Sequence, residues 1–154
     1  MARIVKKPGD VLKYPLSSGK HGYCQWLPDG TARFFLIEST QELPVEQVLS
    51  LPVAFRVVVF RDTPNRYGWS RIGKAPIPPE AASRQRYAKK DILSGRLSII
   101  LEGHEMPATP AEVAGLETWA VWAHPHIVER LEAQLEGRES KFLKGIAVTA
   151  AQHL

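Results

Sequence analysis

Histidine and cysteine, the side chains that most often bind metals or act as nucleophiles, are few and scattered in this chain. The five histidines are His21, His104, His124, His126 and His153. The pair in "HPH" (124–126) is spaced i, i+2, which does not place both rings on one helix face. No Cys-x-x-Cys or His-Glu-x-x-His element is present. We therefore predict no metal site and no cofactor, although His104 or a carboxylate beside the "HPH" pair would complete a zinc site.

Nucleophilic side chains also lack their usual partners in the sequence. There is neither a Gly-x-Ser-x-Gly elbow nor a phosphate-binding P-loop. Ser70 lies between Trp69 and Arg71, with no base visible beside it. Cys24, the single cysteine, falls in a predicted strand and is expected to be a buried, inert thiol. A single cysteine cannot form an intramolecular disulfide, which fits a reducing compartment.

Positive charge is concentrated in the middle of the chain. Residues 56–96 hold ten Lys or Arg and three Asp or Glu, whereas the whole chain of 154 residues has a net charge of +4. Residues 97–154 hold four basic and eight acidic residues. Such asymmetry gives the protein a directed electric field that can steer a partner. The alternative is an ordinary fluctuation of surface charge.

Cations alternate with aromatic residues in this basic part, a pattern found in surfaces that bind single-stranded nucleic acid. The residues are Arg61, Arg66, Tyr67, Trp69, Arg71, Lys74, Arg84, Arg86, Tyr87, Lys89 and Lys90. No helix-turn-helix, zinc finger or RNP motif accompanies them. We therefore do not favour nucleic acid as a partner.

One segment of the basic part, "WSRIGKAPIPPE" (69–80), is unusually stiff. Its prolines fix φ, and Gly73 permits a tight bend or a close approach. We predict a rigid surface crossing, that is, a segment that runs across the protein surface and projects Arg71 and Lys74 into solvent. A preorganised surface of this kind loses less entropy on association. Trp69 would anchor it and contact a partner. Alternatively, Trp69 and Ile72 only hold a long connection against the core.

The elements that would position these residues are short strands and short helices. A three-stranded antiparallel meander is predicted at "GDVLKYPL" (9–16), "YCQWL" (23–27) and "TARFFLIES" (31–39). Further strands are predicted at "VAFRVVVF" (53–60), "SGRLSIIL" (94–101) and "TWAVWA" (118–123). Short helices are predicted at 43–52 and at 108–117, the latter capped by Thr109. Residues 61–96 are expected to be mostly irregular.

The clearest helical pattern begins at "HPH", with His124 as the candidate N-cap and Pro125 as the first helical residue. Its apolar face consists of Ile127, Val128, Leu131, Leu135 and, if the helix continues past Gly137, Phe142. Gly137 can equally end the helix. An acidic stripe runs along the adjacent face and comprises Glu129, Glu132, Glu136 and Glu139.

Together these elements predict an α+β fold in a single domain spanning residues 1–154. We expect a strongly bent, partly barrel-like antiparallel sheet with short helices and a C-terminal amphipathic helix. The basic start "MARIVKKPGD" is not followed by the apolar region of a signal peptide, and no apolar run approaches the roughly 20 residues of a membrane span. We therefore expect a cytoplasmic protein that does not act at a membrane.

Several motifs, taken in order, resemble the bacterial immunity protein 26 family. They are "GDVLKYPL" with "GYCQ", "ARFF", "LPVAFRVVVF", "W-x-x-IGKAPIPPE" and "GLE-x-x-AVW" with "HIVERL", covering roughly residues 9–131. The resemblance implies a protein that neutralises a cognate toxin of a polymorphic toxin system. The same group includes the HocA phosphotriesterase, which implies a small organophosphate hydrolase as the alternative. It supplies no catalytic residues to carry over, so any catalytic residues stay unknown.

We expect the first of these functions, a non-enzymatic protein that blocks a toxin by occlusion, with its oligomeric state open. The candidate contacts are the basic crossing (Trp69, Arg71, Lys74) or the acidic stripe (Glu132, Glu136). An inhibitor of a basic nuclease would usually be acidic, whereas this chain is basic. Either the toxin is not a basic nuclease, or the acidic stripe makes the contact.

A structural ion pair is also expected. Arg56 interrupts the most apolar strand, 53–60, and a charge on that strand needs a partner or access to water. The best candidates are Glu117 and Asp10, because both belong to the motifs that carry the resemblance.

Overall fold

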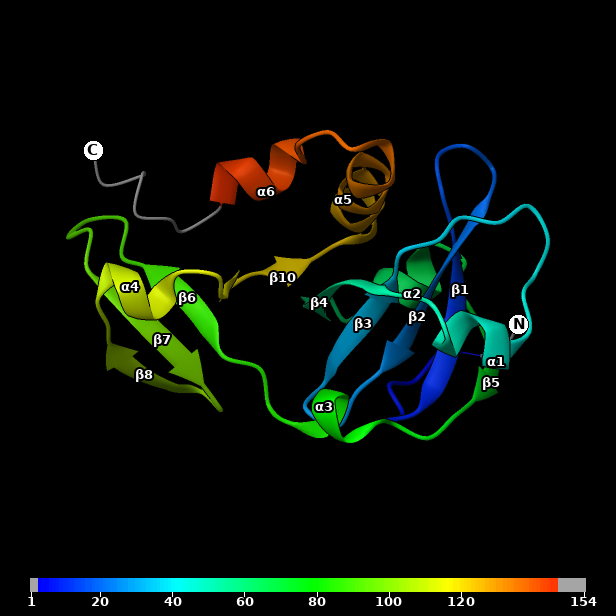
Figure 1. Cartoon of the computed structure of the whole chain (residues 1–154), viewed down its shortest axis with the longest axis horizontal. Coiled ribbons are helices and arrows are strands. Elements are labelled where there is room, and N and C mark those ends of the chain that lie inside the picture. The colour runs from blue at the N-terminus through cyan, green and yellow to red at the C-terminus, as the bar shows by residue number, and fades with distance from the viewer. Residues whose placement is uncertain (1–2, 147–154) are drawn as a thin grey trace.

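Two separate β-sheets form the framework of the protein (Figure 1). The structure, a computed structural model, describes residues 3–146. Sheet A has six strands in the order β10-β4-β3-β2-β1-β5, and sheet B has four in the order β8-β7-β6-β9. The predicted mixture of helices and strands is confirmed. Neither sheet closes into a barrel within residues 3–146, so the expected partly barrel-like sheet is replaced by two open ones.

The centre of sheet A is the predicted meander. Strands β1 (Asp10–Pro15), β2 (His21–Trp26), β3 (Thr31–Phe35) and β4 (Val53–Val59) pair antiparallel in chain order. At one edge β5 (Ser70–Lys74) pairs antiparallel with β1, and at the other β10 (Val121–Trp122) runs parallel to β4. The period-two alternation of apolar residues therefore predicts the four strands β1 to β4, which follow one another along the chain.

Helix α5 (His124–Glu136) covers one face of sheet A. Its buried residues Ile127, Val128 and Leu131 pack against a cluster rich in aromatic side chains that the strands contribute, including Tyr14, Trp26, Phe34, Phe55 and Trp122. The helix ends at Gly137, whose φ of 71° is left-handed. Helix α6 (Lys141–Ile146) follows and adds the half-buried Phe142, Leu143 and Ile146 to the same cluster.

The N-cap of α5 differs from the prediction. Ala123 is the N-cap, with extended backbone (φ −94°, ψ 161°), and His124 is already helical. The imidazole cannot cap, because His124 Nδ1 accepts a hydrogen bond from the indole N–H of Trp69 at 3.0 Å. Tertiary packing therefore overrides the local capping preference.

Helix α1 (Val45–Leu49) packs against the opposite face of sheet A. Val48 is buried there with Val11, Tyr23 and Phe35, which lie on strands β1, β2 and β3. Both faces of sheet A are thus covered, which explains why its central strands are buried over almost their full length.

Sheet B is smaller and consists of β6 (Tyr87–Lys90), β7 (Leu97–Leu101), β8 (His104–Pro107) and β9 (Glu117–Thr118). Its core contains Ala88, Leu97, Ile99 and Val113, the last from helix α4 (Pro110–Val113). The predicted Thr109 cap of α4 is confirmed, with a capping box to Glu112. The single strand expected at 118–123 is instead two, β9 in sheet B and β10 in sheet A, so the chain crosses between the sheets here.

Residues 61–96 are more regular than expected. They contain helix α2 (Thr63–Arg66), strand β5, helix α3 (Pro79–Ala82) and strand β6. Among residues 3–146, no helix combines the length and apolar character needed to cross a membrane.

Candidate partner-binding site

The stiff segment 69–80 includes an edge strand of sheet A. Residues 70–74 form β5, whose one neighbouring strand among the described residues is β1. A Cβ on Gly73 would lie 2.7 Å from Val45 Cγ2 of α1, so glycine permits the close approach of helix and strand. Arg71 and Lys74 are both exposed. The predicted projection of these two cations from a fixed frame fits this geometry.

Trp69 is a core residue, not an exposed anchor. Its side chain is only 3% exposed. The ring stacks on Trp26 with centroids 6.3 Å apart and lies 5.1 Å from the ring of Tyr14. Its indole N–H is occupied by His124. The expectation that Trp69 touches a partner is therefore wrong, because the indole is needed to join β5 to the core.

A cavity of about 410 Å³ lies beside Arg71 and Lys74. It is lined by cations from two parts of the chain, because Arg3 and Lys7 of the N-terminal segment also face it. Asp10, which is buried, lines the same cavity and pairs with Arg71 at 3.1 Å. We call Arg3, Lys7, Arg71 and Lys74 the cation cluster. Sequence reasoning missed Arg3 and Lys7, because the basic start of the chain marks them as cations but not as neighbours of β5.

The acidic stripe of α5 is held by contacts within the protein. Glu132 accepts a hydrogen bond from the Ser17 hydroxyl at 2.6 Å. Glu136 pairs with Arg138 at 3.2 Å, and Glu129 accepts hydrogen bonds from Ser140 Oγ and the backbone N–H of Phe142. These carboxylates fix the β1–β2 turn and the link to α6, which gives the stripe a structural role.

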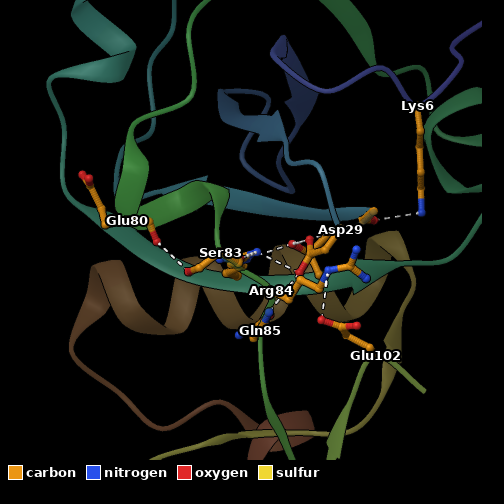
Figure 2. A network of polar contacts seen from close by, with 10 residues as sticks. Lys6, Asp29, Glu80, Ser83, Arg84, Gln85 and Glu102 are labelled. Atoms are coloured by element: carbon orange, nitrogen blue, oxygen red, sulfur yellow. Dashed lines mark hydrogen bonds and ion pairs between the residues drawn. The ribbon is translucent and has the colours of Figure 1, made fainter. Parts of the chain in front are cut away.

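Arg56 has a carboxylate partner, but it is Asp29 in place of the expected Glu117 or Asp10. Arg56 Nη2 lies 2.8 Å from Asp29 Oδ2 and also donates to the carbonyl of Ser83 at 2.7 Å. Asp29 in turn accepts hydrogen bonds from Thr31 and from the backbone N–H of Gln85 (Figure 2). Burial would raise the pKa of Asp29, but these hydrogen bonds and the charge of Arg56 lower it below its ordinary value.

The two expected partners of Arg56 are engaged elsewhere. Glu117 of β9 forms a bidentate pair with Arg130 of α5, and the guanidinium of Arg130 also lies 4.3 Å from the ring centre of Phe55. Asp10 pairs with Arg71 across the β1–β5 edge. Asp29 was overlooked because it lies in the "PDG" turn, far from Arg56 in sequence.

The histidines lie apart in the structure. His124 stacks on Tyr67 with ring centres 4.5 Å apart, and His126 stacks on Phe142 at 3.7 Å. His104 is exposed on β8, and His153 lies outside the described residues. No group of three or more His, Cys, Asp or Glu side chains suited to a metal occurs within residues 3–146. Cys24 is buried, and burial raises the pKa of its thiol.

The aromatic residues of the basic part do not form a stacking surface for bases. Trp69 and Tyr87 are both buried, and Tyr67 is half-buried against His124. Binding of single strands usually combines a positive groove with exposed rings. Here the cations face solvent while these rings pack inward.

Comparison with known families gives a match. Residues 7–98, more than half of the chain, match the family described as immunity protein 26. The matched part contains the whole β1–β5 frame and three members of the cation cluster, Lys7, Arg71 and Lys74. The chain therefore belongs to the immunity protein 26 family, which indicates a role in neutralising a toxin. This description does not mention the phosphotriesterase that the resemblance also implied. No curated protein and no solved structure matches the chain.

Proposed function

We propose that this protein neutralises a cognate bacterial toxin by binding it and occluding its active surface, without chemical change to the toxin. The observation that carries the proposal is the family match over residues 7–98. Occlusion requires a rigid, complementary surface of about 800 Å² on each partner. The covered sheet A supplies such a frame, because its strands are held on both faces.

We propose that the contact is made by the basic surface around β5, with Arg71 and Lys74 at its centre. Two observations favour it over the acidic stripe. Arg71 stays exposed although it pairs with Asp10, and Lys74 is exposed and forms no ion pair with another described residue. Glu132 already accepts a hydrogen bond from Ser17, and Glu136 already forms an ion pair with Arg138. Trp69 supports the surface from beneath through the core. The partner should then present an acidic patch, and salt should slow association.

Paired charge reversals test this assignment. We expect Arg71→Glu with Lys74→Glu to abolish the protection of cells that express the toxin encoded beside this gene. The matched variant, Glu132→Lys with Glu136→Lys, should protect like the parent, provided that circular dichroism shows both variants folded. Loss of protection only in the glutamate variant would place the contact on the acidic stripe.

The setting of this activity is part of the same proposal. We propose that the chain acts in the cytoplasm as one domain, where a free, buried thiol such as Cys24 is stable. A toxin met in the cytoplasm is blocked before it reaches its target there.

A further inference from the structure

The N-terminal segment 3–7 is fastened to sheet A and its connections. The backbone N–H of Ile4 donates to Asn65 Oδ1 at 2.7 Å, and Asn65 Nδ2 donates back to the carbonyl of Ile4 at 3.0 Å. Lys6 Nζ donates to the carbonyls of Val59 and Gly30, and its charge lies 5.3 Å from the ring centre of Trp26. Asn65, on helix α2, therefore fixes the start of the segment through its two hydrogen bonds to the backbone of Ile4.

The other end of the segment is fixed by the backbone around Gly9. Gly9 N donates to the carbonyl of Trp26, and Ala75 N donates to the carbonyl of Gly9. Gly9 has a φ of 95°, and a Cβ there would lie 3.0 Å from the carbonyl oxygen of Ala75. The chain can thus turn from the segment into β1 directly beside the end of β5. This geometry brings Lys7 to the cavity that Lys74 lines.

The cavity between these parts carries a strong excess of positive charge. Four cations line it, and its one lining carboxylate, Asp10, already pairs with Arg71. Its volume of about 410 Å³ lies in the range of roughly 300–1,000 Å³ found for ligand pockets. Val5, which is 58% exposed, adds an apolar contact at the same cavity.

We propose that this cavity receives acidic side chains from a protein partner, and that Asn65 positions the N-terminal half of the cation cluster. This inference rests on the proposed function and names the chemistry of the partner's contact, a short segment rich in Asp or Glu. Charge complementarity decides the occupant, because clustered cations match clustered carboxylates. Nucleic acid fits less well, since the one aromatic residue that lines the cavity, Trp26, is buried and offers no ring on which a base could stack.

The test needs no toxin. The ¹⁵N-labelled full chain is titrated at low salt with a peptide of six glutamates, and with a peptide of six glutamines as the neutral control. We expect the amide resonances of residues 3–7 and 70–75 to shift with the glutamate peptide only. Shifts confined to the other basic stretch, 84–90, or no shift at all, would overturn the assignment of the site.

Two variants then separate charge from positioning. Arg3→Gln with Lys7→Gln should weaken glutamate-peptide binding by about 3- to 10-fold, as expected for the loss of two exposed charges. Asn65→Ala changes no charge, yet it should also weaken binding of the glutamate peptide, because segment 3–7 loses its hydrogen bonds to Asn65. The matched control, Arg84→Gln with Lys89→Gln on the sheet B side, should bind like the parent. Equal binding by the Arg3/Lys7 variant would contradict the proposal.

The labelled chain is also titrated with a single-stranded oligonucleotide of six nucleotides. If it shifts the same resonances at lower concentration than the glutamate peptide, the cavity is a nucleic-acid site and the choice of a protein partner is wrong. The peptide titration can fail while the chain still protects cells from the toxin. That result would contradict only the assignment of the cavity and would leave the proposed function unaffected.

Discussion

Sheet A and sheet B differ in how completely they are covered. Helices α1 and α5 pack on opposite faces of sheet A, so that strands β2 and β3 are almost fully buried. Sheet B has a core of four buried residues, and all of its strand β8 is exposed. Ile92 and Leu93, in the loop between β6 and β7, are each 97% exposed. The candidate site thus lies on the better-covered sheet, where cations can be held in fixed positions.

Polar contacts connect the sheet A side with the chain around sheet B among residues 3–146. Arg56 and Asp29 of the sheet A side bind the chain at Ser83 and Gln85 just before β6. Arg130 of α5 binds Glu117 of β9. Since Arg56 and Asp29 are only 16% and 11% exposed, their attraction is poorly screened by solvent. These contacts therefore couple the less covered sheet to the rigid one.

The largest expected effect comes from truncating a side chain in the covered sheet. Phe34→Ala removes a fully buried ring from the aromatic cluster and should lower the free energy of unfolding by about 3–5 kcal/mol. Ile92→Ser and Leu93→Ser in the exposed loop should change it by no more than about 0.5 kcal/mol. Chemical denaturation measures both. Similar losses at the two places would show that the sheets do not differ in this way.

The next largest effect should come from the Arg56–Asp29 pair, which also binds the chain just before β6. Arg56→Ala leaves Asp29 buried with a charge that lacks its cation, and we expect a loss of about 2–4 kcal/mol, somewhat below a fully buried pair. Arg84→Ala, which breaks the exposed Arg84–Glu102 pair, is the matched control and should cost less than about 1 kcal/mol. An Arg56 variant that unfolds at the same denaturant concentration as the control would refute the coupling.

The stability of the protein should depend on pH through His124, which packs beside the aromatic cluster of sheet A. Burial lowers the pKa of His124 below its ordinary value of 6.5, and Nδ1 must be unprotonated to accept the Trp69 N–H. The unfolded state therefore binds the proton more readily. The contribution of His124 to stability is present above about pH 6.5 and declines as the pH falls through the lowered pKa.

Thermal unfolding between pH 7 and pH 5 tests this expectation. The parent should lose stability across that window, and His124→Gln should lose less. A parent and variant with parallel curves would show that His124 does not titrate on unfolding in the expected way.

The difference between the sheets also explains which features were predictable from sequence. Strands β1 to β4 follow one another and pair in order, so their alternating residues and turn signals sufficed. Strands β6 and β8 are short and were not predicted, although each pairs with its chain neighbour β7. Strand β5 depends on a partner far along the chain, β1. Propensity alone does not report such pairings.

In the candidate site too, features set by the local sequence were predictable and contacts between distant residues were not. Arg71 and Lys74 could be singled out from local stiffness and charge. Trp69 donates to His124, which is 55 residues away, and Arg3 belongs to a segment that Asn65 holds through Ile4. The partner of Arg56 lay in a turn that the sequence marked only as a turn. Contacts of this kind arise from the tertiary fold and have no local signal.

Neutralisation by occlusion is tested most directly by a stoichiometric titration of the cognate toxin with this protein, with toxin activity as the readout. Occlusion predicts that inhibition rises linearly and is complete at one protein per toxin, and that mass spectrometry recovers the toxin unchanged. Complete inhibition at a small fraction of that amount, with the toxin chemically altered, would contradict occlusion and show that the protein acts as an enzyme.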